Sequence, residues 1–142
     1  MSLNLNKILV PVDGSDHSMR AAEYAAKLAR RLDGQILLLN THRPFPVTLG
    51  EPYFQKAINK ILEKANTLLD PFRTLLESEQ VTFTDRILEG TPGEVIPRVA
   101  DIEKCDLIVM GSRGHTNLEG LVLGSVTHRV LRSAPCPVLV VR

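Results

Sequence analysis

The stretch Asp106-Leu-Ile-Val-Met-Gly-Ser-Arg-Gly114 joins a short apolar run to a loop with two glycines. Its apolar residues follow one another without an intervening polar residue, which predicts a β-strand buried on both faces. Gly111 and Gly114 come directly after this strand, and Gly124-Ser125 follows the second glycine after nine residues. A buried strand that runs into such a loop is typical of a parallel sheet covered by helices.

Four further segments of the chain predict strands. Lys7–Val12, Gln35–Leu39 and Pro137–Val141 are mainly continuous apolar runs, which should also be buried on both faces. Val81–Leu88 mixes polar and apolar residues, so we expect it nearer an edge of the sheet. Pro11 has no amide hydrogen to donate, and the first strand should therefore end or become irregular there.

Stretches with apolar residues three and four positions apart lie between these runs and predict helices. The first extends from Ser15 to Asp33 and should stop at Gly34. Its alanines imply that it packs closely on the sheet. The second carries its apolar stripe from Phe54 to Leu69, and Pro71 should kink or end it.

Two more helices are predicted in the second half of the chain. Thr91-Pro92-Gly93-Glu94 predicts a capping box, with threonine as N-cap, proline at the first helical position and glutamate at the third. Gly124-Ser125 precedes the last helix, in which Val126, Val130 and Leu131 should face inward and two arginines outward.

Strands and helices alternate from residue 1 to residue 142 without an internal repeat or a linker. This order predicts a single domain with an open, doubly wound parallel sheet and helices on both faces. In such sheets ligands bind beyond the carboxyl ends of the strands, next to the first strand. The loops that start at Asp13 and Gly111 both lie at that edge. His42–Pro52 is the longest irregular connection, and long loops are often functional.

Composition excludes several classes of protein. The chain is 44% hydrophobic and 23% charged with a net charge of +1, which argues against disorder and against attraction to nucleic acid. It has no apolar run long enough for a membrane helix and no targeting peptide, so we expect a cytoplasmic protein without membrane insertion. Cys105 and Cys136 predict two buried thiols rather than a disulfide, and the histidines lack the spacing of a zinc site.

The glycine loop has the properties of a phosphate site. Glycine has no Cβ, so the backbone amides of the loop can approach a ligand closely. The helix that starts at Ser125 offers unpaired amides, and the hydroxyls of Ser125 and Thr127 can add donors. The spacing is neither that of a Walker A loop nor that of a Rossmann fingerprint. Alternatively, these glycines could serve only to shape a loop and to cap a helix.

Asp13 and Arg113 each have a functional and a structural interpretation. The carboxylate of Asp13 could accept hydrogen bonds from a ribose hydroxyl or an adenine amino group, or it could cap the first helix. Arg113 could pair with a phosphate or lie solvated in the loop. We assign no chemistry to His17, His115 and His128.

Four segments together resemble the universal stress protein family. They are Lys7–Ser15, Val109–Gly114, Leu123–Val126 and Ala134–Arg142, and their order and separations match the family. The resemblance implies a flavodoxin-like sheet with strand order 3-2-1-4-5 and a homodimer. For the nucleotide-binding branch it also implies ATP or AMP held by the glycine loop, because members that do not bind ATP generally lack the glycine pattern that this chain keeps.

The resemblance also implies which residues hold the nucleotide. Asp13 would contact the ribose or adenine, and Thr41 would lie against the adenine at a position that is commonly aliphatic in the family. The glycine loop would surround the ribose and phosphates, which Mg²⁺ could bridge. The implied set is Pro11, Val12, Asp13, Thr41, Met110, Gly111, Arg113, Gly114, Gly124, Ser125, Val126 and Thr127.

The last strand predicts how the protein associates. If Pro137–Val141 lies at the sheet edge, its free amides would invite aggregation unless they are covered. Pairing with the same strand of a second subunit would cover them and satisfy two-fold symmetry. The resemblance implies the same homodimer.

The residues favour a regulatory protein over an enzyme. They predict no nucleophile with a general base and no acidic cluster for two metals. We therefore expect a nucleotide-binding protein of the stress response that changes its contacts with an unknown regulatory partner. Two alternatives stay open: a slow ATPase, and an interaction module with a vestigial loop that binds no nucleotide. A receiver domain is excluded because the third strand ends at Leu88-Glu89, without the required aspartate.

Overall fold

The computed structural model describes residues 5–44, 50–114 and 123–142. The strands are β1 (Lys7–Pro11), β2 (Gln35–His42), β3 (Thr82–Glu89), β4 (Leu107–Gly111) and β5 (Val138–Val141). The helices are α1 (Asp16–Leu32), α2 (Tyr53–Ser78), α3 (Pro92–Ile102) and α4 (Ser125–Ser133). All strand pairs are parallel and the order is β3-β2-β1-β4-β5, which confirms the predicted sheet.

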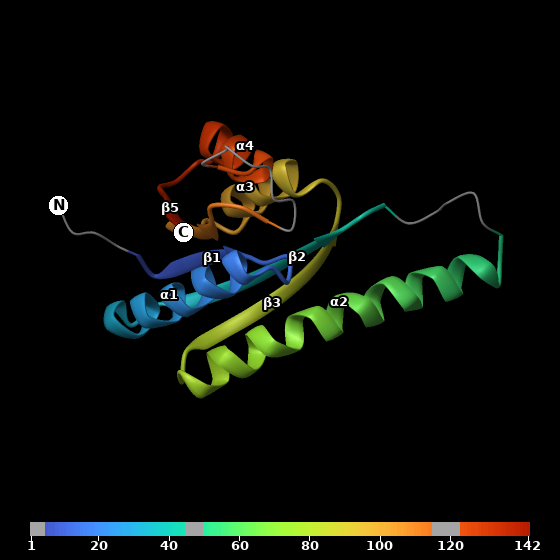
Figure 1. The fold of residues 1–142 in the computed structure, drawn as a ribbon, viewed down its shortest axis with the longest axis horizontal. Coiled ribbons are helices and arrows are strands. Elements are labelled where there is room, and N and C mark those ends of the chain that lie inside the picture. Colours follow the sequence, from blue (N-terminus) through green and yellow to red (C-terminus); the bar gives the residue numbers. More distant parts are fainter. Residues whose placement is uncertain (1–4, 45–49, 115–122) are drawn as a thin grey trace.

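The helices cover both faces of the sheet. α1 and α2 lie on one face, and α3 and α4 lie on the other (Figure 1). The alanines of α1 pack with Ile8, Val10 and the buried side of α2. Their small side chains bring α1 close to the sheet, as the sequence predicted. Leu9, Ile108 and Val130 belong to a second core on the opposite face. No helix of the described residues is long and apolar enough to cross a membrane.

The central strands end where the site begins. β1 ends at Pro11, as its missing donor predicted, and the amide of Val12 still donates to the carbonyl of Leu39 at 2.8 Å. β2 is longer than its apolar run, because its residues pair with β3 as far as His42 with Glu89. The edge position predicted for the third strand is confirmed, and its residues are alternately exposed and half-buried as far as Ile87.

Pro71 was predicted to kink or end the helix. α2 continues through it to Ser78, so an end at Pro71 is wrong. A proline inside a helix costs roughly 3 kcal/mol because a hydrogen bond is lost and the ring crowds the preceding turn. Phe72 and Leu76 follow it and are buried in the core, and each such side chain contributes about 1.5–3 kcal/mol. Arg73 adds hydrogen bonds to Asp85 of β3 and to the carbonyl of Asn66. Tertiary packing therefore offsets the local defect.

Three finer predictions are also wrong. Thr91 is the N-cap of α3 and Pro92 its first residue, as predicted, but Thr91 makes no side-chain capping bond. The amide of Glu94 donates to the carbonyl of Thr91 at 3.0 Å, and the carboxylate of Glu94 accepts from Arg129 of α4 at 2.7 Å rather than reaching back to the cap. Leu131 is 43% exposed rather than inward, whereas Val130 is fully buried. β5 was predicted to be buried on both faces, but its residues are half-buried. It is an edge strand with a neighbouring strand on one side only, and the helices do not enclose it.

Candidate functional site

A cavity of about 220 Å³ opens at the carboxyl ends of the strands. This is the edge where ligands bind in open α/β sheets, beside β1 and β4 at the point where strand order reverses. The cavity is lined by Pro11, Val12, Asp13, Ser18, Leu39, Thr41, His42, Arg43, Gly90, Pro92, Ile96, Met110, Gly111, Arg113, Gly114, Val126 and Thr127.

Every residue of the implied binding set lines this cavity except Gly124 and Ser125. These two begin α4 beside it: a Cβ on Gly124 would lie 3.3 Å from Cα of Arg113 and 3.7 Å from the amide nitrogen of Gly114. The amide of Gly124 donates to the carbonyl of Ser112 at 2.7 Å. Gly124 therefore lies against residues Ser112 to Gly114, although residues 115–122 between the two segments lie outside the described part of the chain.

The glycines are required by close neighbours rather than by backbone conformation. A Cβ on Gly111 would lie 2.8 Å from Cβ of His17 and 2.9 Å from its carbonyl carbon. A Cβ on Gly114 would lie 2.5 Å from Oδ2 of Asp13. Real Cβ atoms do not approach other atoms this closely. At Gly111 the contact includes backbone atoms of His17, so a side chain there would force β4 and α1 apart, whereas at Gly114 the contact is with the end of the Asp13 side chain, which would have to shift.

Asp13 belongs to the loop before α1 but is not its N-cap. Ser15 is the N-cap, and its hydroxyl accepts a hydrogen bond from the amide of Ser18. Oδ1 of Asp13 accepts from the amide of Ser15 at 2.9 Å, across Gly14, whose positive φ of 85° favours glycine. The interpretation of Asp13 as a cap is therefore wrong, and its carboxylate is held at the cavity wall.

Two hydroxyl residues near the loop are already used by the protein. Thr127 is buried and donates its hydroxyl hydrogen to the carbonyl of Gly111 at 2.8 Å. A hydroxyl has one hydrogen to donate, so we do not expect Thr127 to donate to a phosphate. Ser112 is 3% exposed, and its Oγ lies 3.4 Å from Nδ1 of His17. Neither Ser112 nor His17 lines the cavity.

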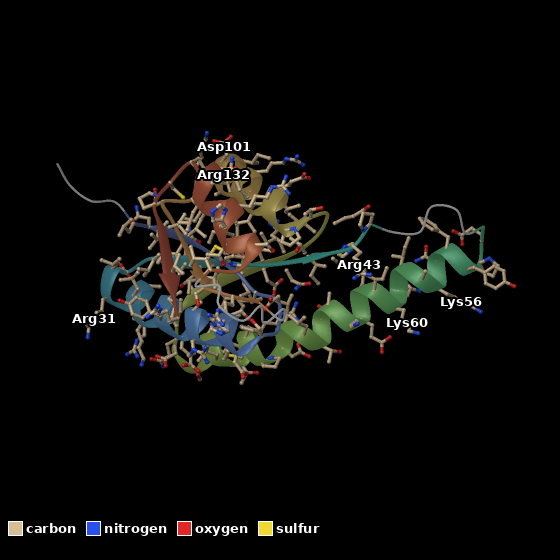
Figure 2. The ribbon with its side chains drawn as sticks, turned by 45° about the horizontal axis from the view of Figure 1, so that its top comes forward. Arg31, Arg43, Lys56, Lys60, Asp101 and Arg132 are labelled. Atoms are coloured by element: carbon tan, nitrogen blue, oxygen red, sulfur yellow. The ribbon has the colours of Figure 1, made fainter. Side chains whose placement is uncertain are left out.

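The charged residues of the cavity come from three different strand ends. Asp13 follows β1, Arg43 follows β2 and Arg113 follows β4. Figure 2 shows Arg43 where β2 ends, and Lys56 and Lys60 on the half of α2 that extends past the sheet. The first turns of α1, α3 and α4 also reach this edge, with Ser18, Pro92 and Val126 in the lining. Helix N-termini favour negative charge, so two guanidinium groups and three helix ends favour an anionic ligand.

Several lining residues did not emerge from the sequence. Leu39, His42 and Arg43 lie there because β2 continues beyond its apolar run. Gly90, Pro92 and Ile96 lie there because the loop after β3 ends at the same edge. The Thr91-Pro92 helix start was the available signal for this second group, since a helix that follows a strand begins at the carboxyl edge. The predicted functional loop His42–Pro52 falls partly outside the described residues.

The two cysteines lie away from the cavity. Both are free thiols, and they precede β4 and β5 at the amino edge of the sheet. Cys105 is buried, and burial raises its pKa to about 11. Cys136 is half-buried, less than predicted, and its pKa is also raised by burial. Within the described residues no three His, Cys, Asp or Glu side chains gather to form a metal site.

Comparison with known proteins places the chain in a family. The model of the universal stress protein family matches residues 4–142. A universal stress protein encoded in the 3′ region of the QAH/OAS sulfhydrylase gene of Thermus aquaticus is 40% identical, over 95% of this chain and 97% of the relative. The solved structure of MJ0577, from Methanocaldococcus jannaschii, is 32% identical and matches with a TM-score of 0.85, over 96% of this chain and 95% of that chain.

A further solved structure shares the fold and carries a ligand. It is a universal stress protein in complex with cAMP, 24% identical with a TM-score of 0.75, and the match covers 97% of each chain. At that identity the likeness concerns the fold. The family match along nearly the whole sequence and the identity to the Thermus relative are what identify this protein: it belongs to the universal stress protein family.

Proposed function

We propose that this protein is a regulatory adenine-nucleotide-binding protein of the stress response, with ATP or AMP in the cavity at the carboxyl edge of the sheet. The observation that carries the proposal is the cavity itself. Its walls combine apolar side chains, two guanidinium groups and one carboxylate beside the glycine loop. A nucleotide has the matching parts: a flat base, a ribose with hydroxyl donors, and phosphates.

The base would occupy the apolar part of the cavity. Val12, Leu39 and Met110 form this part at the strand ends, and Ile96 approaches from α3. Thr41 adds a hydroxyl that can read the edge of the base. The volume of about 220 Å³ is smaller than the roughly 300–1,000 Å³ of typical small-molecule sites, so the cavity would hold the base and ribose.

The phosphates would then extend from Asp13 toward the loop and the start of α4. Arg113, Gly114 and the first turn of α4 adjoin one another there. Amide donors and the positive helix end favour phosphate at this position. A magnesium ion would find the single carboxylate of Asp13 in the lining and would otherwise need phosphate oxygens and water as ligands.

Two further observations support the proposal. A protein of the same fold binds cAMP, so this architecture can hold an adenine nucleotide. The described cavity lining also pairs no nucleophile with a general base, and the one close serine–histidine pair, Ser112 with His17, lies outside it. We therefore propose regulation rather than catalysis, with at most a weak ATPase activity.

We further propose that the protein acts in the cytoplasm as a homodimer paired through β5. β5 is an edge strand, and the carbonyls of Pro137 and Val141 accept hydrogen bonds from the amides of Ile108 and Ser112, in and directly after β4. Because successive residues of a strand point their polar groups to opposite sides, Val138 and Val140 present theirs to the open edge. A second β5 could pair with these groups around a two-fold axis.

Calorimetric titration of ATP and of AMP into nucleotide-stripped protein, with and without magnesium, tests the nucleotide proposal. We expect saturable binding of an adenine nucleotide that is lost in Gly114→Asp, because that side chain would enter the space of the Asp13 carboxylate. Phosphate release should stay below a few turnovers per hour. Absence of binding by folded wild-type protein would overturn the proposal and favour the interaction module with a vestigial loop.

A further inference from the structure

Asn40 is a buried polar residue beneath the first loop of the site. It is 6% exposed, and its side-chain amide Nδ2 donates to the carbonyl of Val12 at 3.0 Å. Its neighbours in β2, Leu39 and Thr41, line the cavity, whereas Asn40 does not. Side chains alternate along a strand, so Asn40 lies on the opposite face, on the side covered by α1 and α2.

The hydrogen bond of Asn40 lies directly beyond the last backbone hydrogen bond between the β1 segment and β2. The amide of Val12 donates to the carbonyl of Leu39 at 2.8 Å, which is the last backbone bond from this part of the chain to β2. The carbonyl of Val12 then accepts from the side chain of Asn40. Both polar groups of Val12 are thus held by β2, although β1 itself ends at Pro11.

This bond fixes the direction in which the next residue leaves the sheet. The peptide group is planar, so holding the carbonyl oxygen of Val12 also holds the amide nitrogen of Asp13. The carboxylate of Asp13 is held closely on both sides. Oδ1 accepts a hydrogen bond from the amide of Ser15, and Oδ2 lies so near Gly114 that a Cβ on that glycine would be only 2.5 Å away. A rotation of the Val12–Asp13 peptide would move the carboxylate either into the loop or out of the cavity.

We propose that Asn40 is a positioning residue of the nucleotide site, which holds the Asp13 carboxylate in the cavity through the carbonyl of Val12. Its effect on a ligand rests on the proposed nucleotide binding, but its effect on the loop does not. Asn40→Leu keeps the approximate size and removes the donor. Asn40→Asp keeps the shape and replaces the donor with an acceptor that faces another acceptor.

The first test is the affinity for ATP measured by calorimetry. Asn40→Leu and Asn40→Asp should each weaken binding about tenfold or more, a loss of about 1.4 kcal/mol or more in binding free energy. The matched control is Val81→Ala, which truncates a buried side chain just before β3. Val81 lies at the amino ends of the strands, away from the cavity at their carboxyl ends. This variant should leave the affinity within about twofold while it lowers the stability.

A double-mutant cycle separates positioning from a general structural role. In an Asp13→Ala background, Asn40→Leu should have no further effect on ATP affinity, because the group that it positions is gone. An equal loss in both backgrounds would overturn the proposal. So would an unchanged affinity of the Asn40 variants in a wild type that binds ATP.

Hydrogen exchange of the Ser15 amide tests the loop without any ligand. This amide donates to Oδ1 of Asp13, so Asn40→Leu should lower its protection at least threefold more than that of amides in the middle of α1. If wild-type protein binds no nucleotide but this selective loss occurs, the proposed function fails and the positioning role holds. A uniform loss across α1, as in Val81→Ala, would overturn the positioning role.

Discussion

Gly114 and Asp13 meet at the site although 101 positions separate them in the sequence: a Cβ on Gly114 would lie 2.5 Å from Oδ2 of Asp13. The contact joins the loop after β4 to the loop after β1. Position 114 has no side chain because the carboxylate of Asp13, which we propose contacts the nucleotide, occupies that space.

Gly114→Ala should weaken adenine-nucleotide binding about tenfold or more, because the methyl group must displace the Asp13 carboxylate or the loop. Stability should fall by about 1 kcal/mol or less, since one side-chain end gives way. Calorimetry and urea unfolding measure the two effects. The control is Gly50→Ala, because a Cβ at that glycine meets nothing within 4 Å. Equal affinity of Gly114→Ala and wild type would refute the steric argument.

Gly111→Ala should destabilise the fold by about 1–3 kcal/mol, the usual range for overpacking. Its Cβ would lie 2.9 Å from the carbonyl carbon of His17, and a backbone atom cannot rotate away as a side chain can. The free energy of unfolding in urea checks this, again with Gly50→Ala as reference. A stability loss no greater than that of Gly114→Ala would show that α1 and β4 can separate without cost.

Val140→Pro should convert the proposed dimer into a folded monomer. Its amide points to the open edge of β5, so the substitution removes a donor for the partner strand and spares the pairing with β4. Leu139→Pro is the control: its amide faces β4, so it should disrupt the fold itself. Sedimentation velocity and circular dichroism distinguish the outcomes. A Val140→Pro protein that stays dimeric would place the interface elsewhere.

The thiol of Cys105 should be inert in the folded protein, since burial raises its pKa to about 11 and little thiolate exists at neutral pH. Alkylation by iodoacetamide at pH 8 should be much slower than in urea-unfolded protein. The folded state binds the thiol proton of Cys105 more tightly than the unfolded state does. The contribution of this thiol to the free energy of unfolding is therefore present below pH 9 and is lost between pH 9 and 11. The loss should be on the order of 2 kcal/mol, and Cys105→Ala should lack most of it.

Glu103 should stabilise the fold at pH values above its ordinary pKa, where its carboxylate is ionised, and not below it. The hydrogen bond from Lys7 at 3.0 Å is the main cause that lowers the pKa of Glu103, and Arg86 adds to it at 2.9 Å. The folded state therefore binds this proton more weakly, so the contribution is present above about pH 4.5 and is lost as the pH falls through the folded pKa. Glu103→Gln should flatten the acid limb of urea-unfolding stability; an unchanged slope between pH 5 and 3 would contradict this.

The order of elements and the edge that carries the cavity were predictable from the sequence. Unbroken apolar runs such as Leu107–Met110 indicate strands buried on both faces, and the period of α1 indicates a helix that covers them. These patterns are local, because burial acts on each residue through its place in its own strand or helix. The carboxyl edge follows from the alternation of strands and helices, and with it the position of Asp13 and Gly111.

The contacts that make the site were decided by the tertiary structure. Gly111 packs on His17 and Gly114 on Asp13, and such partners lie about a hundred positions apart in the chain, beyond the reach of any local pattern. β2 extends to His42 because β3 pairs with it, and α2 passes Pro71 because Phe72 and Leu76 are buried beyond it. The physical reason is the same in each case: local propensity is worth about 1–3 kcal/mol, and packing against a distant segment can exceed it.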